Sequence, residues 1–489
     1  MTSIVLTTLN ARYTHASMGL RCLRANLAGL RIDSVIDEYI IGQQTNEVVE
    51  KLLSHHPKII GFGVYIWNVD DTTKIVALLK RVAPEVVIIL GGPEVSFEID
   101  EQRICQLADY VVTGWGDVTF RKLAQAVLHG PKPLMKIHAG EQPPLSELAM
   151  PYGEYTDTDI AHRTLYVEAS RGCPFKCEFC LSALDKTAWP FETEAFLKQM
   201  EMLYQRGARQ FKFVDRTFNL NAKVSLKILQ FFLDRYTEED PIYAHFELVP
   251  DHLPDVLKET IAKFPRGALQ FEIGIQTFNT EVQTLVSRKQ NNDKAAENLR
   301  WLHTQSSAHM HVDLIAGLPG ENMQSFGAGF DRLVGLGPHE IQFGILKRLR
   351  GTPIIRHTAP YRMTFSPDAP YEIVANQDLT FNDMQRMSRF ARYWDLVANS
   401  GRFANTLPLL LKNAPFDNFM MFADWLYVTT GKTHQFALER LFEFVQSYLV
   451  LTQDMATVDA ALTIDKERAQ MKTRSAKLQR QQRHEAVLK

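Results

Sequence analysis

The sequence predicts an α/β protein in three parts: a doubly wound domain, a partial barrel of six β/α units and a helical C-terminal region. Two observations lead to this prediction. Short apolar runs rich in Val and Ile alternate with helical patterns in two separate series, which is typical of parallel sheets covered by helices. After about residue 370 the strand signals stop and aromatic-rich helical patterns follow.

The first series occupies residues 1–130 and predicts a doubly wound, Rossmann-like domain. Its expected strands are a weak one around 32–39 and stronger ones at 3–8, 59–65, 86–90 and 110–113. Helical patterns separate them, at 19–30, 71–82 and 118–128. Because such sheets bind ligands beyond the carboxyl ends of their strands, we expect a binding site there. Residues 131–163 contain prolines and little periodicity, so we expect a linker.

The second series occupies residues 164–365 and predicts six strands, at 165–169, 210–215, 243–249, 271–276, 310–315 and 341–346. Intervening helices are expected at 192–206, 222–235 and 293–305. Six units close only part of a barrel, since the full form needs eight. Residues 366–489 are expected to form a helical domain, including helices at 383–399 and 433–448. Its last stretch, 465–489, is rich in Lys, Arg and Gln and is expected to be a solvated or frayed helix.

The composition is that of a globular protein, with 489 residues, 45% hydrophobic and 22% charged. A formal net charge of −2 gives no sign of a nucleic-acid-binding surface. We find no signal-peptide pattern and no apolar run of the roughly 18 residues that a membrane span needs, so we expect a cytoplasmic protein. Two of the five cysteines, Cys22 and Cys105, stand alone in apolar helical patterns and are expected to be buried.

The other three cysteines form the pattern Cys173-x3-Cys177-x2-Cys180, directly after the expected strand at 165–169. Three thiolates can ligate three irons of a four-iron cluster and leave the fourth iron open for a substrate. A structural zinc site is the alternative, but it usually needs two separated pairs of ligands, and the sequence has no second pair. The pattern therefore favours a catalytic [4Fe-4S] cluster on these cysteines.

The triplet, with Phe179 just before its last cysteine, resembles the signature of the radical SAM superfamily. This resemblance implies that the open iron chelates S-adenosylmethionine and that the reduced cluster cleaves it to a 5′-deoxyadenosyl radical. It also implies an electron donor such as flavodoxin or ferredoxin. Segments at the ends of later expected strands resemble those that line the cofactor cavity, which implies that Asp215, Gln276 and Gly317 join Phe179 in binding S-adenosylmethionine. Each segment alone is also compatible with an ordinary turn. The occurrence of all of them, in order along the chain, favours the resemblance.

The first domain lacks the G-x-G-x-x-G pattern of dinucleotide binding. Its fourth and fifth expected strands end in glycine-rich turns, Gly91-Gly92-Pro93 and Gly114-x-Gly116, where bare backbone leaves room for a large planar ligand. The order of these segments resembles the cobalamin-binding domain of one branch of radical SAM enzymes, which implies that these five residues contact cobalamin. The helical tail resembles a C-terminal extension in some members of that branch.

The sequence differs from many cobalamin-binding proteins in the motif that supplies a histidine below the cobalt. Cobalamin proteins with a histidine there carry D-x-H-x-x-G, whereas here Tyr13 occupies the acidic position and His15 stands four residues before Gly19. A ligating histidine normally needs a partner that fixes its tautomer, which makes His15 the weaker candidate. We expect cobalamin without a histidine below it, and Tyr65 or Trp67 near its lower face.

Together these features predict a cobalamin-dependent radical SAM enzyme, with methylation of an unactivated carbon as the favoured reaction. A cyclase or rearrangement enzyme with the same cofactors is an alternative. A cobalamin-binding or redox-sensing protein is an alternative from a different class. A methylthio-transferring enzyme is disfavoured because it needs further cysteines. The substrate, a small molecule or a peptide, and the catalytic residues do not follow from the sequence.

Overall fold

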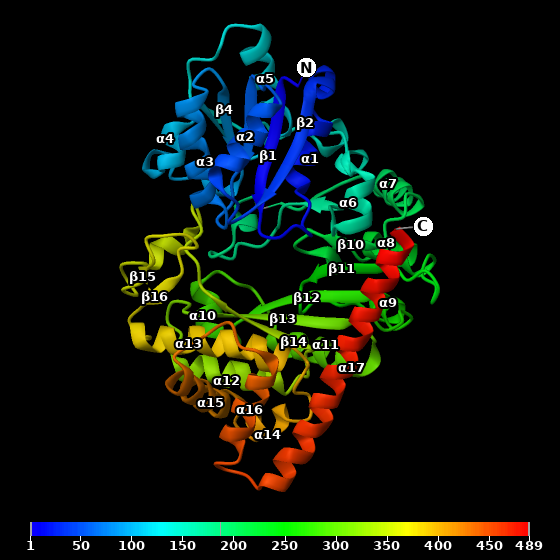
Figure 1. Ribbon diagram of the computed structural model, residues 1–489, viewed down its shortest axis with the longest axis vertical. Helices are drawn as coiled ribbons and strands as arrows, with labels where there is room; N and C mark the ends of the chain where they lie inside the picture. The colour runs from blue at the N-terminus through cyan, green and yellow to red at the C-terminus, as the bar shows by residue number, and fades with distance from the viewer. Residues whose placement is uncertain (1, 186, 488–489) are drawn as a thin grey trace.

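The N-terminal part of the computed structural model is a six-stranded parallel sheet (Figure 1). The structure describes residues 2–185 and 187–487, with side chains described as far as Met471. The strand order is β2-β1-β3-β4-β5-β6. The strands are β1 (Ile4–Asn10), β2 (Ser34–Ile40), β3 (Ile59–Gly63), β4 (Val87–Gly91), β5 (Tyr110–Thr113) and β6 (Ile137–Ala139). All seven residues of β1 are buried, as expected for a central strand covered on both faces.

Helices cover both faces of this sheet. They are α1 (Met18–Ala25), α2 (Thr45–Ser54), α3 (Val69–Val82), α4 (Arg103–Leu107) and α5 (Asp117–His129). Apolar side chains of α2, α3 and α4 pack in one cluster on one face, and those of α1 and α5 pack in a second cluster on the other. The predicted doubly wound fold is therefore confirmed.

The segment 131–163, expected to be an aperiodic linker, is more ordered than predicted. Its first part contributes β6 to the N-terminal sheet, and its last part forms α6 (Asp157–His162). The strand escaped notice because it has three partly or fully exposed residues and no apolar run. The segment also packs against α1, where Arg21 forms a buried ion pair with Asp159 (2.8 Å).

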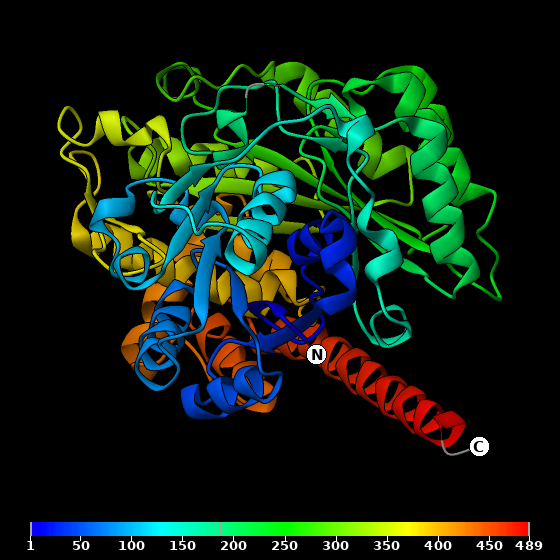
Figure 2. The same ribbon diagram turned by 90° about the horizontal axis from the view of Figure 1, so that it is seen from above.

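The second part is an open sheet of six parallel strands in the order β14-β13-β12-β11-β10-β7, so the predicted partial barrel is confirmed. The strands are β7 (Leu165–Val167), β10 (Gln210–Phe213), β11 (Tyr243–Leu248), β12 (Leu269–Gln276), β13 (His309–Ala316) and β14 (Glu340–Ile345). The short strands β8 (Ser170–Arg171) and β9 (Trp189–Pro190) form a separate pair. Figure 2, from above, shows the N-terminal part lying over the green strands of this barrel.

Burial alternates strictly along β12 and β13, because one face of the sheet packs against helices and the other lines the barrel interior. The helices are α7 (Thr193–Gln205), α8 (Ala222–Leu233), α9 (Asp255–Ile261), α10 (Thr280–Leu285), α11 (Asn292–Gln305) and α12 (Met323–Val334). On the helix side, Phe213 packs against Phe246 with ring centres 4.4 Å apart. The interior side carries polar residues, and this asymmetry leaves the barrel open to ligands.

The C-terminal region begins with a two-stranded hairpin that the sequence did not predict, β15 (Thr364–Phe365) and β16 (Ile373–Ala375). Helices follow: α13 (Phe381–Trp394), with a π-helical turn at Asp395–Asn399, then α14 (Leu407–Leu411), α15 (Pro415–Thr430), α16 (Leu438–Leu449) and α17 (Met455–Val487). They share one hydrophobic core with the barrel. Phe390 of α13, for example, packs against Phe343 of β14 (5.0 Å between ring centres).

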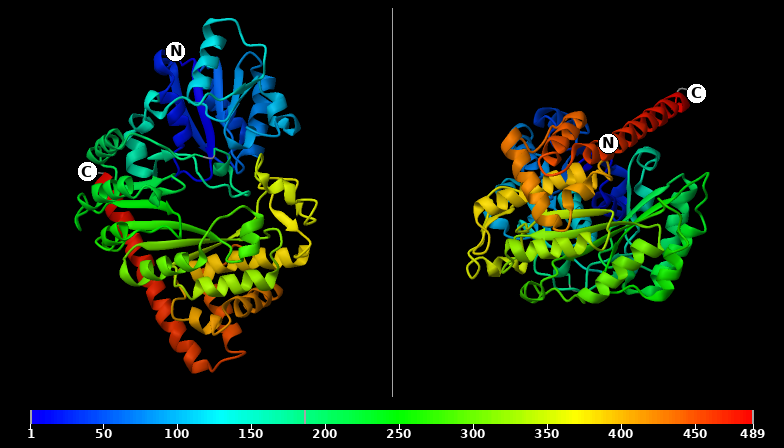
Figure 3. Two further views of the ribbon diagram at one scale, coloured as in Figure 1. Left: turned by 180° about the vertical axis from the view of Figure 1, so that it is seen from behind. Right: turned by 90° about the horizontal axis from the view of Figure 1, so that it is seen from below.

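The last helix, α17, is anchored at Asp465 and then extends away from the body (Figures 2 and 3). The fully buried carboxylate of Asp465 accepts hydrogen bonds from the amide and hydroxyl of Thr406, at 2.9 and 2.7 Å. The prediction of a solvated or frayed end concerns side chains that, beyond Met471, fall outside the described set. No helix in the described ranges has the length and apolar character of a membrane span.

Candidate functional site

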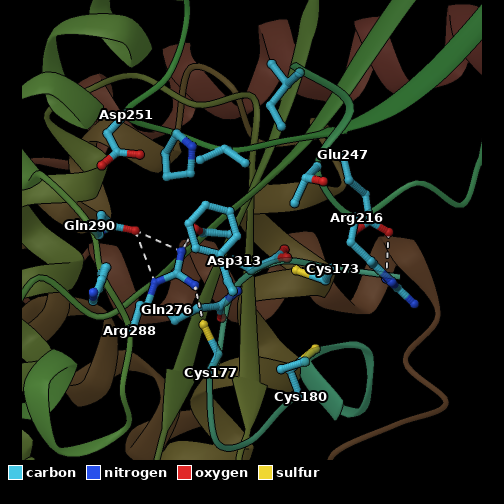
Figure 4. Close-up of a pocket in the computed structure, with 18 of the residues that line it drawn as sticks. Cys173, Cys177, Cys180, Arg216, Glu247, Asp251, Gln276, Arg288, Gln290 and Asp313 are labelled. Carbon is cyan, nitrogen blue, oxygen red and sulfur yellow. Dashed lines mark hydrogen bonds and ion pairs between the residues drawn. The ribbon is translucent and has the colours of Figure 1, made fainter. Parts of the chain in front are cut away.

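The cysteine triplet lies on a loop that leaves the carboxyl end of β7. β8 pairs antiparallel with β9 and closes the base of this loop. Gly172 has a left-handed φ of +90° and packs against backbone where a Cβ would not fit. Cys173 and Cys177 are buried, Cys180 is partly exposed, and all three line one cavity of about 210 Å³ (Figure 4).

The arrangement of the three thiols suits a polynuclear cluster. The three cysteines come from one short loop and all line the same cavity. In an iron–sulfur cluster each iron takes its own thiolate, so the sulfur atoms face a common space and stay apart. Burial raises the pKa of the free Cys173 thiol to about 11, so binding of iron must displace its proton.

A buried glutamate inside the triplet holds the loop. Glu178 is 3% exposed, and its carboxylate contacts the guanidinium of Arg356, Nε2 of His357 (2.9 Å) and the hydroxyl of Ser287 (2.5 Å). Its backbone amide donates to the carbonyl of Val286 at 3.0 Å. The loop is thus fixed by the segment after α10 and by the segment after β14.

Polar groups from later strands and from the segment after α10 also line this cavity (Figure 4). Arg288 Nη1 lies 3.6 Å from Sγ of Cys177, and its guanidinium also contacts the carbonyl of Gly274. Oε1 of Gln276 and Oδ1 of Asp313 are buried and have no hydrogen-bond partner among the residues described. The cavity therefore offers the guanidinium of Arg288, a second one of Arg216 that is paired with Glu247 (2.6 Å), and two acceptors without a hydrogen-bond partner. This set fits a ligand with a carboxylate and with hydroxyl or amino donors.

Two carboxyl groups of this cavity have opposite pKa shifts. The imidazole of His245, 3.2 Å away, and the ammonium of Lys212 lower the pKa of Glu272 to about 2. Burial, together with the charges of Glu272 and Glu247, raises the pKa of Asp313 well above its usual value. Asp313 is therefore poised to bind a ligand either as a proton donor or, beside a cation, as an acceptor.

A second cavity of about 360 Å³ lies at the carboxyl end of the N-terminal sheet, on the face covered by α1 and α5. Glycines of three neighbouring strands and of the turns that follow them form one wall: Gly61, Gly63, Gly91, Gly92, Gly114 and Gly116. Apolar side chains, including Leu23, Ile89 and Val112, form the rest of the interior. A large planar ligand fits such a wall, because the bare backbone lets it approach closely.

Arg171 links the cysteine loop to the second cavity. It lines the second cavity and stands two residues before Cys173. Its guanidinium pairs with Asp117 at the start of α5 (3.0 Å) and with Glu168 (3.0 Å). It also lies 4.8 Å from the ring centre of Trp115, between the two glycines of that turn. The cysteine loop and the glycine wall are therefore in direct contact through this side chain.

Three family models match the chain in the same order as these structural parts. A B12 binding domain matches residues 4–124, and the radical SAM superfamily matches residues 167–333. The chain therefore contains a B12 binding domain followed by a radical SAM domain. A family described as a protein of unknown function, DUF4080, matches residues 359–487, the hairpin and C-terminal helices.

This radical SAM protein is similar to proteins named as methyltransferases. It is 27% identical over 250 residues to an uncharacterized methyltransferase of Pyrococcus horikoshii, covering 45% of this chain and 54% of the relative. It is 24% identical over 325 residues to the 2-(S-pantetheinyl)-carbapenam-3-carboxylate methyltransferase of Streptantibioticus cattleyicolor, covering 59% and 47%. It is 23% identical over 321 residues to the cobalamin-dependent radical SAM methyltransferase TokK of Streptomyces tokunonensis, covering 58% and 46%. The chain thus spans about half the length of these relatives.

Two solved structures share the fold of this radical SAM protein. The cobalamin-dependent S-adenosylmethionine radical enzyme OxsB, solved with aqua-cobalamin, superposes with a TM-score of 0.65 at 14% identity, over 96% of this chain and 80% of that one. The radical S-adenosylmethionine methyltransferase TsrM from Kitasatospora setae, solved with cobalamin and a [4Fe-4S] cluster, gives 0.57 at 15% identity, over 72% and 74%. At these identities the likeness concerns the fold.

Of the four residues predicted to bind S-adenosylmethionine, Phe179 and Gln276 line the cysteine cavity. Asp215 does not line it: its buried carboxylate accepts hydrogen bonds from the amide of Ala169 (3.0 Å) and the hydroxyl of Ser170 (2.7 Å), just before the loop. Gly317 does not line it either, and a Cβ there would lie 2.5 Å from Cγ2 of Ile373 in the hairpin. These two residues stabilise the surroundings of the cavity.

Of the residues predicted to contact cobalamin, Tyr65 and the four glycines line the second cavity, whereas Trp67 and Pro93 do not. Trp67 stacks on Tyr65 with ring centres 4.5 Å apart and an angle of 5°. Nδ1 of His15 lies 2.6 Å from the hydroxyl of Tyr166, and burial lowers its pKa. His15 is therefore engaged with β7 and lies outside the lining of the cavity.

Sequence reasoning missed most polar residues of the cysteine cavity and its support, and four of them show why. Glu247 and Asp313 lie in segments that resemble the superfamily, but nothing in the sequence distinguished them from their neighbours. Arg288 lies after a short helix and outside those segments. Glu178 lies between two of the cysteines in the sequence. The residues that its carboxylate contacts are more than 100 positions away, so no local sequence pattern reveals these contacts.

Proposed function

We propose that this protein is a cobalamin-dependent radical SAM enzyme that methylates an unactivated carbon of a small molecule or peptide. The observation that carries the proposal is the link between the cysteine loop and the second cavity: three cysteine thiols line the first cavity, glycines wall the second, and Arg171, two residues before Cys173, lines the second. When bound, a [4Fe-4S] cluster with S-adenosylmethionine supplies a 5′-deoxyadenosyl radical for hydrogen abstraction, and cobalamin supplies the methyl group.

In the first cavity, Cys173, Cys177 and Cys180 would hold the cluster. Arg288, beside Cys177, is suited to bind the carboxylate of S-adenosylmethionine, because a guanidinium forms strong charge-assisted hydrogen bonds with carboxylates. The unpaired oxygens of Gln276 and Asp313 are suited to accept hydrogen bonds from its hydroxyl or amino groups. Phe179 offers an apolar wall, also within this cavity.

In the second cavity, the wall formed by Gly91, Gly92, Gly114 and Gly116 would lie against the corrin. Tyr65 would lie nearest its lower face, and burial raises the pKa of this phenol, so the side chain stays neutral. Trp67 would act indirectly, since its ring stacks on Tyr65 and its Nε1 donates to the carbonyl of Leu9 at 3.2 Å.

The names of the curated relatives support methyl transfer over cyclisation or rearrangement. An electron donor such as flavodoxin or ferredoxin would reduce the cluster. The five cysteines are all free, which is typical of a reducing compartment, and we place the protein in the cytoplasm.

The test is anaerobic reconstitution of the full chain with iron, sulfide and hydroxocobalamin, followed by dithionite and S-adenosylmethionine. We expect release of 5′-deoxyadenosine and a corrin absorbance that remains after desalting. Cys180→Ala should abolish the release, whereas Cys105→Ala, which removes a buried thiol from the N-terminal core, should not.

The possible outcomes separate the alternatives. An intact cluster and bound corrin without 5′-deoxyadenosine would favour a sensor. A protein that makes 5′-deoxyadenosine but retains no corrin would refute the cobalamin half of the proposal. A screen for products that carry a methyl label from S-adenosylmethionine then distinguishes methylation from rearrangement.

A further inference from the structure

The chain between β14 and the C-terminal helices reaches back to the N-terminal sheet, at the turn that follows β4. Arg350 donates from Nε to Oε1 of Glu94 and from Nη1 to Oε2 of Glu98, both at 2.8 Å. Arg348 donates to the other oxygen of Glu98 at 3.0 Å. Two arginines from the end of the barrel therefore hold this turn.

The hairpin of the C-terminal region adds a tyrosine to these pairs. The hydroxyl of Tyr371 donates to Oε1 of Glu94 at 2.9 Å and accepts from Nη2 of Arg350 at 3.1 Å. Its ring centre lies 4.9 Å from the guanidinium carbon of Arg350, and its backbone carbonyl accepts from the amide of Arg348 at 3.0 Å. We call Glu94, Glu98, Arg348, Arg350 and Tyr371 the Glu94 clamp.

The core of the clamp is shielded from water. The side chains of Glu94 and Arg350 are 3% and 14% exposed. A buried charge without its partner is strongly unfavourable, so the two side chains hold each other in place. Beside them, the ring of Phe97 lies directly against Gly351, whose φ of +78° and missing Cβ permit this close approach.

The clamp lies opposite the other contacts that join the N-terminal part to the barrel. Arg171 with Asp117 and Tyr166 with His15 tie the N-terminal part to β7 and its loop. Arg350, in contrast, follows β14, and β7 and β14 are the two edges of the barrel sheet. Figures 1 and 3 show the yellow segment around β15 and β16 rising towards the N-terminal sheet on that side.

We propose that the Glu94 clamp is a positioning device. It fixes the distance between the glycine-walled second cavity, called the corrin cavity from here on, and the cysteine cavity. Glu94 follows Gly91 and Gly92 in the turn that walls the corrin cavity, so a shift of Glu94 moves that wall. Through Tyr371 the C-terminal region takes part in placing the corrin over the barrel opening. The part of this inference that concerns the corrin and the cluster rests on the proposed function.

The test uses the full chain with Arg350→Ala, reconstituted with iron, sulfide and hydroxocobalamin. Pulsed electron paramagnetic resonance on the reduced protein measures the distance between the cobalt and cluster spins. We expect corrin and iron to be retained, with a longer or broader distance distribution than in the wild type. Hydrogen exchange on the cofactor-free chain is a second readout, in which the amides of residues 92–98 should exchange at least about tenfold faster.

Two further variants complete the test. Arg386→Ala removes an ion pair of the C-terminal helices (2.6 Å to Asp424) and should change neither readout. Tyr371→Phe removes one hydroxyl, keeps all charges and should produce a smaller change in the same direction. It decides the matter if the Arg350→Ala variant does not fold.

An unchanged distance distribution and unchanged exchange in the clamp variants would overturn the proposal. Equal effects in Arg386→Ala would also overturn it, because they would indicate general loosening of the C-terminal region. If the wild type binds neither corrin nor cluster, the proposed function fails, and hydrogen exchange alone still decides whether the clamp holds the turn.

Discussion

Gly91→Leu should block the second cavity, the corrin cavity of our proposal, without damaging the sheet. Gly91 ends β4, shares a strand face with Ile89, and both line the cavity. A Cβ at this position would meet only the carbonyl oxygen of Val112, at an ordinary contact distance of 3.7 Å. The further carbon atoms of a leucine therefore extend into open space, which is the cavity itself.

The expected loss of cobalamin affinity follows from the cost of placing extra atoms in a space that the ligand fills. The cavity measures about 360 Å³, and a leucine there would overlap any ligand that lies against the glycine wall. Extra methylene groups in a packed site cost about 1–3 kcal/mol, or roughly five- to 150-fold in the dissociation constant of cobalamin. The free energy of unfolding should change by less than about 1 kcal/mol, because leucine is acceptable in a strand.

The assay is a titration of the cofactor-free full chain with hydroxocobalamin, followed by tryptophan fluorescence and by corrin absorbance after desalting. Gly91→Ala is the matched control and should bind almost as the wild type does. Gly92→Ala is a contrasting variant: its φ of +108° and a Cβ 2.5 Å from the carbonyl of Val64 should destabilise the fold by about 1–3 kcal/mol. Wild-type cobalamin affinity in Gly91→Leu would refute the assignment of this cavity.

Three more variants test the cysteine cavity and its surroundings. Glu178→Ala should lower the iron content after reconstitution, because the buried His357 and the more exposed Arg356 lose their common acceptor, at a cost of about 1–3 kcal/mol. Arg288→Ala should weaken S-adenosylmethionine binding by about 1.5–3 kcal/mol, measured by calorimetry, with iron content unchanged. Burial raises the pKa of Glu321 to about 7 in the folded protein, so its share of stability is full at low pH and is lost as pH rises through 7. Between pH 5 and pH 8 the free energy of unfolding, measured with urea, should therefore fall less in Glu321→Gln than in the wild type, by up to about 3 kcal/mol.

Each of these predictions has a result that contradicts it. Glu178→Gln keeps the shape and most hydrogen bonds, so an equal loss of iron in Gln and Ala variants would argue against anchoring by the carboxylate. Loss of iron in Arg288→Ala would place this residue with the cluster. A pH profile that is the same in wild type and Glu321→Gln would show that this carboxyl group is exposed to water in solution.

The fold was largely predictable because its strands are short, apolar and separated by amphipathic helices. The predicted runs at 110–113 and 165–169 correspond to β5 and β7 within two residues. β6 was missed because an exposed three-residue edge strand carries no hydrophobic signal. The hairpin of β15 and β16 was missed for a similar reason, since strands of two and three residues have no recognisable period.

The cysteine site was predictable only where its chemistry is local. Cys173, Cys177 and Cys180 are neighbours in sequence, so their spacing alone predicts a cluster. Arg288 and Asp313 reach the same cavity from distant strands and loops. Asp215 shows the opposite case: it follows β10 by two residues, near the expected strand end, yet it accepts a hydrogen bond from the backbone before the loop and does not line the cavity.

The sequence by itself determined that three thiolates follow the first strand of a partial barrel, behind a sheet whose strands end in glycines. These features depend on residue type and on spacing along the chain, which the sequence states directly. Only the tertiary structure decided that Arg171, next to the cysteine loop, lines the second cavity and that Arg350 and Tyr371 meet Glu94. The contacts of Arg350 and Tyr371 with Glu94 join residues more than 200 positions apart, and their geometry arises only when the sheet, the barrel and the helical region pack together.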